Sequence, residues 1–156
     1  MKKILFLCTG NSCRSIIAEV LLNNLGKIRF QAFSAGSFPT GTVNPDSIKL
    51  LQQHDLATVN LASKSWHDLS HIKFDIVITV CDNAAGETCP LYLGQAIKAH
   101  WGIPDPDKVT GENRPQAFAK AFNQLKHRIE KLLDLKETEI TATNLNKIGA
   151  TQNEFI

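Results

Sequence analysis

Apolar and polar residues follow one another in segments of changing period, and the periods predict the elements of the fold. Ile4–Leu7 is a short apolar run that predicts a buried strand. It continues into Cys8–Ser15, a stretch rich in turn-forming residues. Apolar residues then recur at helical spacing over Arg14–Leu25, with Gly26 as the predicted stop. This part of the chain predicts a strand, a tight loop and a helix.

Further strands and helices alternate along the middle of the chain. Ile28–Phe33 has a period of two and predicts a second strand. A helix is predicted from Asn44, the N-cap, to about His54, because a proline follows the asparagine. Phe74–Val80 is β-branched and almost entirely apolar, which is typical of a central parallel strand, and Ala99–Gly102 predicts a weaker one.

The last third of the chain predicts one long amphipathic helix over Pro115–Leu135, with its apolar residues on one face. Residues 138–156 show little periodicity, and we expect them to form a tail that is partly mobile. The predicted organisation is therefore one domain over residues 1–137, followed by this tail. Strands that alternate with helices predict a three-layer α/β/α fold.

Composition and charge narrow the class of protein. The 156 residues are the length of one domain, and 43% hydrophobic with 21% charged residues is ordinary globular usage. A net charge of +2 argues against a strongly basic nucleic-acid partner, although it permits a small anion site. No window approaches the roughly 20 apolar residues that span a bilayer, so we expect a cytoplasmic protein without a membrane partner. Four cysteines are too few for a disulfide framework and indicate reactive thiols or a metal.

The most informative motif is the anion loop, Cys8–Ser15, in which Arg14 and Ser15 follow Cys8 after five residues. It lies between a predicted strand and a predicted helix, where main-chain N–H groups and the helix dipole favour an anion. Arg14 can bind two oxygens of an oxyanion at once. The residues predicted to bind the oxyanion are Thr9, Gly10, Asn11, Ser12, Cys13, Arg14 and Ser15.

The same loop predicts a reactive thiol. Its positive field is expected to lower the pKa of Cys8 well below the free value of about 8.5, so that Cys8 is a thiolate at neutral pH. Gly10 permits the positive φ that a tight loop needs, and Ser15 can donate a hydrogen bond to the sulfur. The alternative is a buried cysteine in an ordinary strand–helix turn beside a surface arginine.

A carboxylate between two prolines supports the same chemistry. Asp105 lies between Pro104 and Pro106, which stiffen its loop. Near a cysteine–arginine oxyanion site such a group can protonate a leaving oxygen. The alternative is a simple turn aspartate.

These residues carry a resemblance to a known family. The anion loop, Ser34–Gly36 and Asp105-Pro106 resemble the low-molecular-weight tyrosine phosphatase superfamily over residues 1 to about 135. Thr79–Cys81 and His100–Gly102 are similar to its arsenate reductase branch, the kind that thioredoxin recycles. The resemblance implies a four-stranded parallel sheet with helices on both faces.

The resemblance also implies catalytic roles. Cys8 would attack arsenate, Cys81 would attack the thiol–arsenic adduct, and Cys89 would move the disulfide outward to thioredoxin, or to glutaredoxin with glutathione. Arg14 and Asp105 complete the catalytic set. The interval from Cys81 to Cys89 is one residue longer than in the best-known thioredoxin-coupled members. If the family resemblance is set aside, Cys81 is interpreted as a small buried apolar residue and Cys89 as an ordinary loop thiol.

Two other functions remain open. A phosphatase that hydrolyses phosphoesters through a phosphocysteine would use the same loop and Asp105. Its phosphotyrosine pocket needs aromatic walls, yet Asp107-Lys108 follow the Asp-Pro pair, and residues 37–43 contain Phe38 but neither Trp nor Tyr. The pocket therefore suits a small inorganic anion such as arsenate or phosphate. A non-catalytic oxyanion or redox sensor is the third possibility.

No cofactor or metal is expected. The chain has no Cys-x-x-Cys pair, and its five histidines are scattered, so zinc is a poor fit. Some family members hold a potassium ion near the anion loop, and Asn11, Glu19 and Ser34 match three of its ligand positions. Lys64 falls on the fourth, acidic position. We hypothesise that its ammonium replaces the ion, pairs with Glu19 and braces Asn11; the alternative is a solvated surface lysine.

Overall fold

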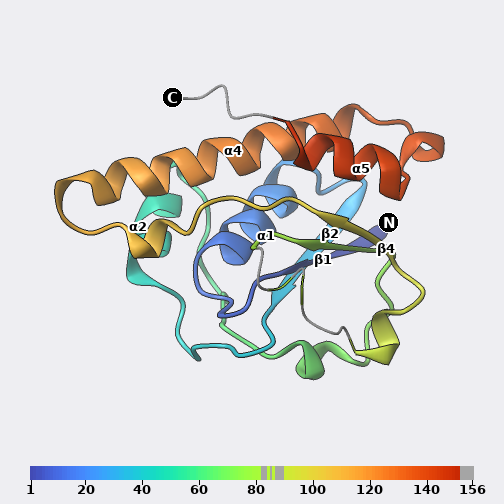
Figure 1. The fold of residues 1–156 in the computed structure, drawn as a ribbon, viewed down its shortest axis with the longest axis horizontal. Helices are drawn as coiled ribbons and strands as arrows, with labels where there is room; N and C mark the ends of the chain where they lie inside the picture. The colour runs from blue at the N-terminus through green and yellow to red at the C-terminus, as the bar shows by residue number, and fades with distance from the viewer. Residues whose placement is uncertain (82–83, 85, 87–89, 152–156) are drawn as a thin grey trace.

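Four parallel strands form a single sheet in the order β2-β1-β3-β4 (Figure 1). The computed structural model describes residues 1–81, 84, 86 and 90–151. The strands are β1 Lys2–Leu7, β2 Phe30–Ala35, β3 Ile76–Thr79 and β4 Ile97–His100. The predicted α/β fold with a four-stranded parallel sheet is confirmed.

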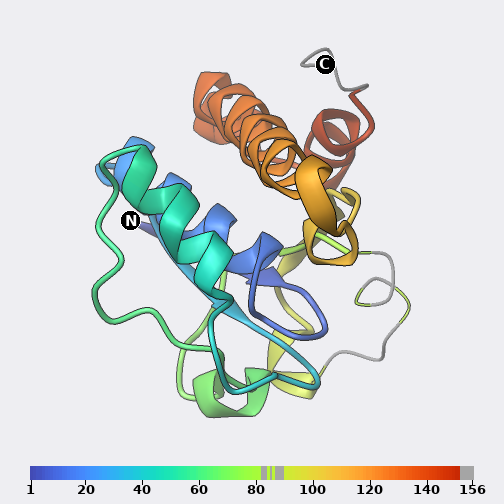
Figure 2. The same cartoon turned by 90° about the vertical axis from the view of Figure 1, so that its left-hand side faces the viewer.

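Helices cover one face of this sheet, and short turns of helix cover the other (Figures 1 and 2). The α-helices are α1 Arg14–Leu25, α2 Pro45–Gln53, α4 Arg114–Asp134 and α5 Ala142–Gly149. In the described part of the chain, five 3-10 helices lie between them: η1 Trp66–Leu69, η2 Leu91–Leu93, η3 Pro106–Lys108, η4 Gly111–Asn113 and η5 Glu137–Glu139. Helices α1, α4 and α5 lie on one side of the sheet and η1 and η2 on the other. Among the described residues, no helix is long and apolar enough to cross a membrane.

The apolar patterns account for the layers. Residues 4–7 of β1 are at most 1% exposed, because the central strand is covered on both faces. Helix α4 packs mainly against α1 and buries most of the predicted stripe, whereas Leu133, the last predicted position, is only partly buried. The buried members are Phe118, Ala121, Phe122, Leu125, Ile129 and Leu132. The side chain of Asn44 caps α2 by accepting from the Asp46 N–H at 2.9 Å, as its sequence predicts.

All four strands begin at other residues than predicted; β1 starts earlier, at Lys2, and β3 starts later, at Ile76. Strand β2 starts at Phe30 rather than Ile28, because the turn after α1 closes with a hydrogen bond from the Arg29 N–H to the Gly26 carbonyl. Ile28 is left 87% exposed. Strand β4 ends before Trp101, whose indole N–H donates to the Leu145 carbonyl at 2.9 Å.

The segment after residue 138 differs most from expectation. Thr141 caps helix α5 by accepting from the Asn144 N–H, and Leu145 and Ile148 are buried. A Cβ atom on Gly149 would overlap the His100 carbonyl oxygen, so α5 packs directly on β4. No helix was predicted in this segment, whereas residues 142–149 form α5. Two apolar positions on a helix of about two turns produce too little periodicity to detect.

Candidate active site

Three loops meet at the carboxyl edge of the sheet, where parallel strands end side by side. Leu7 of β1 is in register with Thr79 of β3, and Thr79 is in register with His100 of β4. Cys8 follows β1 directly, and Cys81 comes two residues after β3. We call residues 103–109, which follow β4 and contain Asp105, the acid loop. The topology thus gathers residues that are far apart in the sequence.

The anion loop is fastened through its main chain. The carbonyl oxygens of Thr9, Gly10 and Ser12 accept hydrogen bonds of 3.0, 3.0 and 3.1 Å from the N–H groups of residues 38, 40 and 44. A Cβ atom on Gly36 would lie 2.8 Å from the Cys8 carbonyl oxygen and still closer to that of Thr9. The loop therefore needs glycine at the end of β2, and its carbonyl groups are turned toward the segment 38–44.

Asn11 provides the sharp turn within the loop. It adopts a positive φ of 47°, a conformation that asparagine tolerates better than most residues. Its buried side chain accepts from the Lys64 N–H at 2.9 Å and donates to Ser15 Oγ at 2.8 Å. The expectation that Gly10 supplies the positive φ is wrong. A Cβ at Gly10 would instead lie 3.3 Å from Thr40 Cγ2, so this glycine allows the neighbouring segment to approach.

Cys8 and Cys81 form a buried pair of thiols. Their side chains are hydrogen bonded to each other, and both residues are buried. That hydrogen bond and burial raise the pKa of Cys8, against the opposing effect of Arg14. The same hydrogen bond lowers the pKa of Cys81 to about 5, assisted by the main-chain N–H groups of Ala84 and Thr9.

The pKa of Cys8 is therefore raised, and the expectation of a lowered value is wrong for this arrangement. The sequence places Cys8 beside Arg14, but it does not show the second thiol that competes for the same proton. The titration belongs to the pair, because the first thiolate accepts a hydrogen bond from the remaining thiol. The two thiols therefore titrate as a unit rather than independently.

Arg14 and Asp105 lie together at the mouth of the loop. Arg14 Nη1 donates to the Ile103 carbonyl at 3.0 Å, and Nη2 lies 3.5 Å from Asp105 Oδ2. Arg14 Nε is buried and has no partner within the described residues, so it is a donor available to a bound oxyanion. Asp105 Oδ1 accepts from the Asp107 N–H at 3.0 Å, which fixes the orientation of the carboxylate.

A partly buried charge pair lies behind the anion loop. Lys64 Nζ lies 3.9 Å from Glu19 Oε1, which also accepts from the Ser34 hydroxyl. Burial raises the pKa of Glu19 and lowers that of Lys64. The Lys64 side chain is 24% exposed, so it is not a freely solvated lysine. Asn11 is braced by the main-chain N–H of Lys64 rather than by its ammonium group.

Some candidate residues stay outside this arrangement. Cys89 lies outside the described residues. Cys13 is the buried N-cap residue of α1, and burial raises its pKa. Phe38 is 76% exposed beside the anion loop. In the described part of the chain, no group of three His, Cys, Asp or Glu side chains is placed to hold a metal ion.

Sequence reasoning missed residues that hold the site from outside. Ser63 donates to the Gly10 carbonyl at 3.1 Å, and Asn44 Nδ2 donates to Asp107 Oδ1 at 3.0 Å. Arg114 joins Asp46 to Asp107. One signal was available, because Arg114 is the first residue of α4 and a cation is unfavourable at a helix N-terminus unless acidic groups surround it.

The chain is similar to known proteins along most of its length. Residues 3–147 match the family described as low molecular weight phosphotyrosine protein phosphatase. The chain belongs to this family. It is 34% identical over 142 residues to an arsenate reductase of Shouchella clausii, an alignment that covers 87% of this chain and 98% of that protein.

Solved structures of the same family have the same fold. An arsenate reductase in the phosphate binding state superposes with a TM-score of 0.73 at 28% identity, covering 85% of this chain and 97% of that one. A low molecular weight protein tyrosine phosphatase from T. tengcongensis superposes with a TM-score of 0.71 at 21% identity, covering 86% of this chain and 99% of that one. The second likeness concerns the fold alone.

Proposed function

We propose that this protein reduces arsenate to arsenite through a relay of cysteines that starts at Cys8. The observation that carries the proposal is the buried, hydrogen-bonded pair of Cys8 and Cys81 beside Arg14. Phosphoester hydrolysis needs only one nucleophilic cysteine, whereas reduction by thiols needs a second one within reach. The similarity to arsenate reductases supports the same reading.

In the first step, the loop and Arg14 bind arsenate, and Cys8 attacks the arsenic atom. The proton of Cys8 passes to Cys81 along their hydrogen bond, which leaves the nucleophilic thiolate on Cys8. A sulfur–arsenic bond forms and an arsenic–oxygen bond breaks. The departing oxygen takes a proton from Asp105 and leaves as water. Arsenic remains pentavalent.

The second step transfers two electrons from the thiols to arsenic. Cys81 loses its proton and attacks the Cys8 sulfur, so a disulfide forms while the sulfur–arsenic bond breaks. The electron pair of that bond stays on arsenic, which leaves as trivalent arsenite and takes up the proton. Two thiols are oxidised to one disulfide, and arsenic gains two electrons.

The third step resets the site. Cys89 attacks the Cys81 sulfur, Cys8 leaves as a thiolate, and a disulfide between Cys81 and Cys89 results. Thioredoxin then reduces this disulfide; glutaredoxin with glutathione is the other candidate reductant. Such a cycle requires a compartment that keeps thiols reduced, and we place the protein in the cytoplasm.

Phosphoester hydrolysis is the second candidate function. It is favoured by the contact between Arg14 and Asp105, because a carboxyl group beside the bound oxyanion can protonate an alcohol leaving group. Water would then hydrolyse the phosphocysteine. This cycle uses neither Cys81 nor Cys89.

Variants of the two relay cysteines separate the two functions. Cys81→Ser and Cys89→Ser are each expected to stop multiple-turnover arsenate reduction with thioredoxin, yet to spare hydrolysis of an aryl phosphate. In a single turnover, Cys81→Ser releases no arsenite, because no thiol can attack the adduct. Cys89→Ser releases one arsenite per protein and retains a disulfide between Cys8 and Cys81.

The trapped disulfide is measured by mass spectrometry after free thiols have been alkylated. The assay contains no small thiols, because glutathione could replace either cysteine. Cys13→Ser is the matched control, since we assign Cys13 no part in the relay. Full steady-state turnover by Cys89→Ser, or arsenite release by Cys81→Ser, would overturn the relay.

A further inference from the structure

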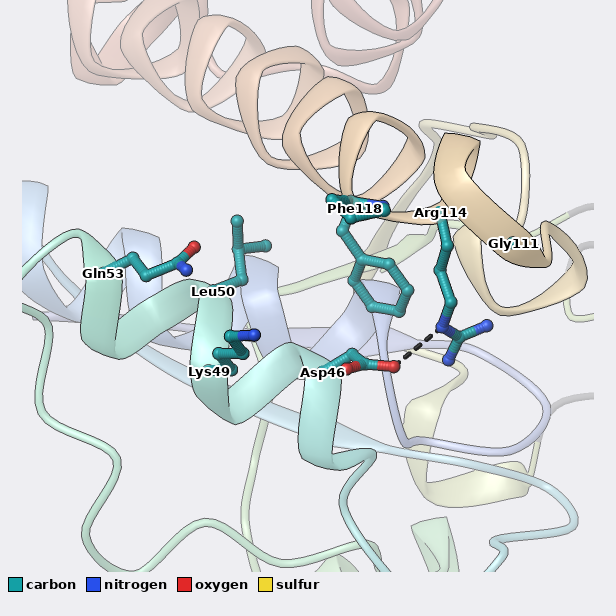
Figure 3. A pocket seen from close by; sticks show the side chains of 8 residues that line it. Asp46, Lys49, Leu50, Gln53, Gly111, Arg114 and Phe118 are labelled. Atoms are coloured by element: carbon teal, nitrogen blue, oxygen red, sulfur yellow. Dashed lines mark hydrogen bonds and ion pairs between the residues drawn. The ribbon is translucent and has the colours of Figure 1, made fainter.

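Arg114 joins three parts of the molecule beside a cleft between α2 and α4 (Figure 3). Its Nε donates to Asp46 Oδ2 at 2.7 Å, at the start of α2. Its Nη2 donates to Asp107 Oδ1 at 2.9 Å, and its Nη1 donates to the carbonyl groups of Asp107 and Val109 at 3.0 and 3.1 Å. The guanidinium lies 5.0 Å from the centre of the buried Phe118 ring. Four hydrogen bonds and a ring contact therefore fix this one side chain.

Arg114 is connected to Asp105 through Asp107. Arg114 holds Asp107 by both its side chain and its carbonyl group. The N–H of Asp107 in turn donates to the Asp105 carboxylate at 3.0 Å. Arg114 thus fixes the donor that orients the carboxylate, although it touches neither the anion loop nor the thiols.

The same helix holds the residues just before the acid loop in a different way. Arg128 of α4 is 6% exposed and donates to the Trp101 and Gly102 carbonyl groups at 2.8 and 3.2 Å. Loss of Arg128 would leave buried carbonyl groups without a donor, which destabilises the fold. The Arg114 side chain is 24% exposed and its two carboxylate partners are about half exposed, so its loss should leave the fold intact.

We propose that Arg114 is a positioning residue for the reaction, which holds the acid loop so that Asp105 delivers its proton to the departing oxygen. This inference rests on the proposed function, in which Asp105 is the proton donor. A lysine cannot replace Arg114, because an ammonium group cannot reach two carboxylates and two carbonyl groups in one plane.

The test is a double-mutant cycle on aryl phosphate hydrolysis and on single-turnover adduct formation from arsenate. Arg114→Met is expected to lower kcat by about 100-fold, as a small displacement of a catalytic group does, with KM little changed. In the Asp105→Asn background, the same substitution is expected to change kcat by less than about twofold. Equal losses in both backgrounds would overturn the proposal, because a merely structural role does not depend on Asp105.

A second measurement tests whether Arg114 affects protonation of the leaving group. Aryl phosphates with poor leaving groups need the proton more than those with good ones. Arg114→Met is therefore expected to slow the hydrolysis of phenyl phosphate much more than that of 2,4-dinitrophenyl phosphate. Lys49→Met is the matched control. Lys49 lines the same cleft (Figure 3), and its substitution removes the same charge at a residue that does not hold Asp107. An equal loss for both substrates in Arg114→Met would contradict the proposal.

A third measurement does not depend on activity. The Asp107 amide is expected to exchange with solvent about tenfold faster in Arg114→Met than in Lys49→Met or the unmodified protein. Unchanged exchange would overturn the proposed path from Arg114 to Asp105. If the unmodified protein turned over neither arsenate nor aryl phosphates, the proposed function would fail, and exchange would still decide whether Arg114 holds this amide.

Discussion

The two loops that surround the candidate oxyanion site are held by different means. The anion loop is tied by main-chain hydrogen bonds from Thr9, Gly10 and Ser12 to residues 38–44, and Gly36 allows the close approach. In the acid loop, the N–H groups of Lys108 and Val109 bond to carbonyl groups of the loop itself. One main-chain bond, from the Ile103 N–H to the Val80 carbonyl, and several side chains tie this loop to the rest of the molecule.

The difference follows from what each loop must do. An anion bound by main-chain N–H groups needs a fixed backbone, and main-chain bonds fix it whatever the side chains are. A proton donor needs one carboxylate at one place, and arginine side chains can supply that on a polar surface. Substitutions near the anion loop should therefore affect both folding and binding. Substitutions at the outer contacts of the acid loop should affect chemistry alone.

The largest expected effect is on the nucleophile. Cys8→Ser should abolish both arsenate reduction and aryl phosphate hydrolysis, because a serine hydroxyl is not ionised at neutral pH. The side chains are nearly the same size, so thermal unfolding and phosphate affinity should stay close to those of the unmodified protein. Phosphate binding is measured by calorimetry. Turnover within about tenfold of the unmodified rate would refute the assignment of Cys8.

Asp105→Asn tests the acid loop itself. It should slow aryl phosphate hydrolysis and adduct formation from arsenate by about 100- to 10,000-fold, the usual contribution of general acid catalysis. Phosphate affinity should hardly change, because the anion loop and Arg14 remain. Rates are compared at several pH values with the phosphate dissociation constant measured alongside. A loss of less than about threefold in both reactions would make Asp105 a turn residue only.

Gly36→Ala and Asn44→Ser compare the two kinds of attachment directly. A Cβ at Gly36 meets the carbonyl groups of Cys8 and Thr9, so unfolding should become easier by about 1–3 kcal/mol. Asn44→Ser keeps an N-cap oxygen for Asp46 but removes the donor to Asp107, so stability should change by less than about 0.5 kcal/mol. Both values come from denaturant unfolding. A larger stability loss in Asn44→Ser than in Gly36→Ala would contradict the comparison.

The smallest effect concerns the charge pair behind the anion loop. Lys64 lowers the pKa of Glu19, which burial raises, so Lys64→Ala should raise it further. A carboxyl group whose pKa is raised by folding stabilises the fold below its unfolded pKa, and that stability is lost as pH rises through the folded pKa. The unfolding free energy of Lys64→Ala should therefore fall over a wider pH range above the unfolded pKa of about 4.3 than that of the unmodified protein.

The same variant tests whether the ammonium stands in for a potassium ion. The unmodified protein should be equally active in potassium and sodium buffers. Lys64→Ala should gain a dependence on potassium or bind phosphate more weakly, while Lys64→Arg, the control, should keep the charge and the independence. Strong activation of the unmodified protein by potassium would remove this interpretation of Lys64.

Many helices and strands could be predicted from local sequence patterns. The bounds of α1 follow from helical spacing and Gly26, and the start of α2 follows from Asn44 and its proline. Such elements depend on interactions between residues close in sequence, which a single chain displays directly. The short helix α5 was not predicted, because the burial of Leu145 and Ile148 depends on packing against Trp101 and β4, which are distant in sequence.

Local sequence patterns were enough to predict the α/β order of elements, the anion loop around Cys8 and Arg14, and Asp105 as a second candidate group. Each of these lies in one continuous stretch of chain. Folding alone places Cys81 beside Cys8 and brings Arg114 to the acid loop past the start of α2. These facts depend on strand order and helix packing. A pKa or a hydrogen bond between distant residues is set by the neighbours that folding brings within a few ångströms, and no local pattern records which ones those are.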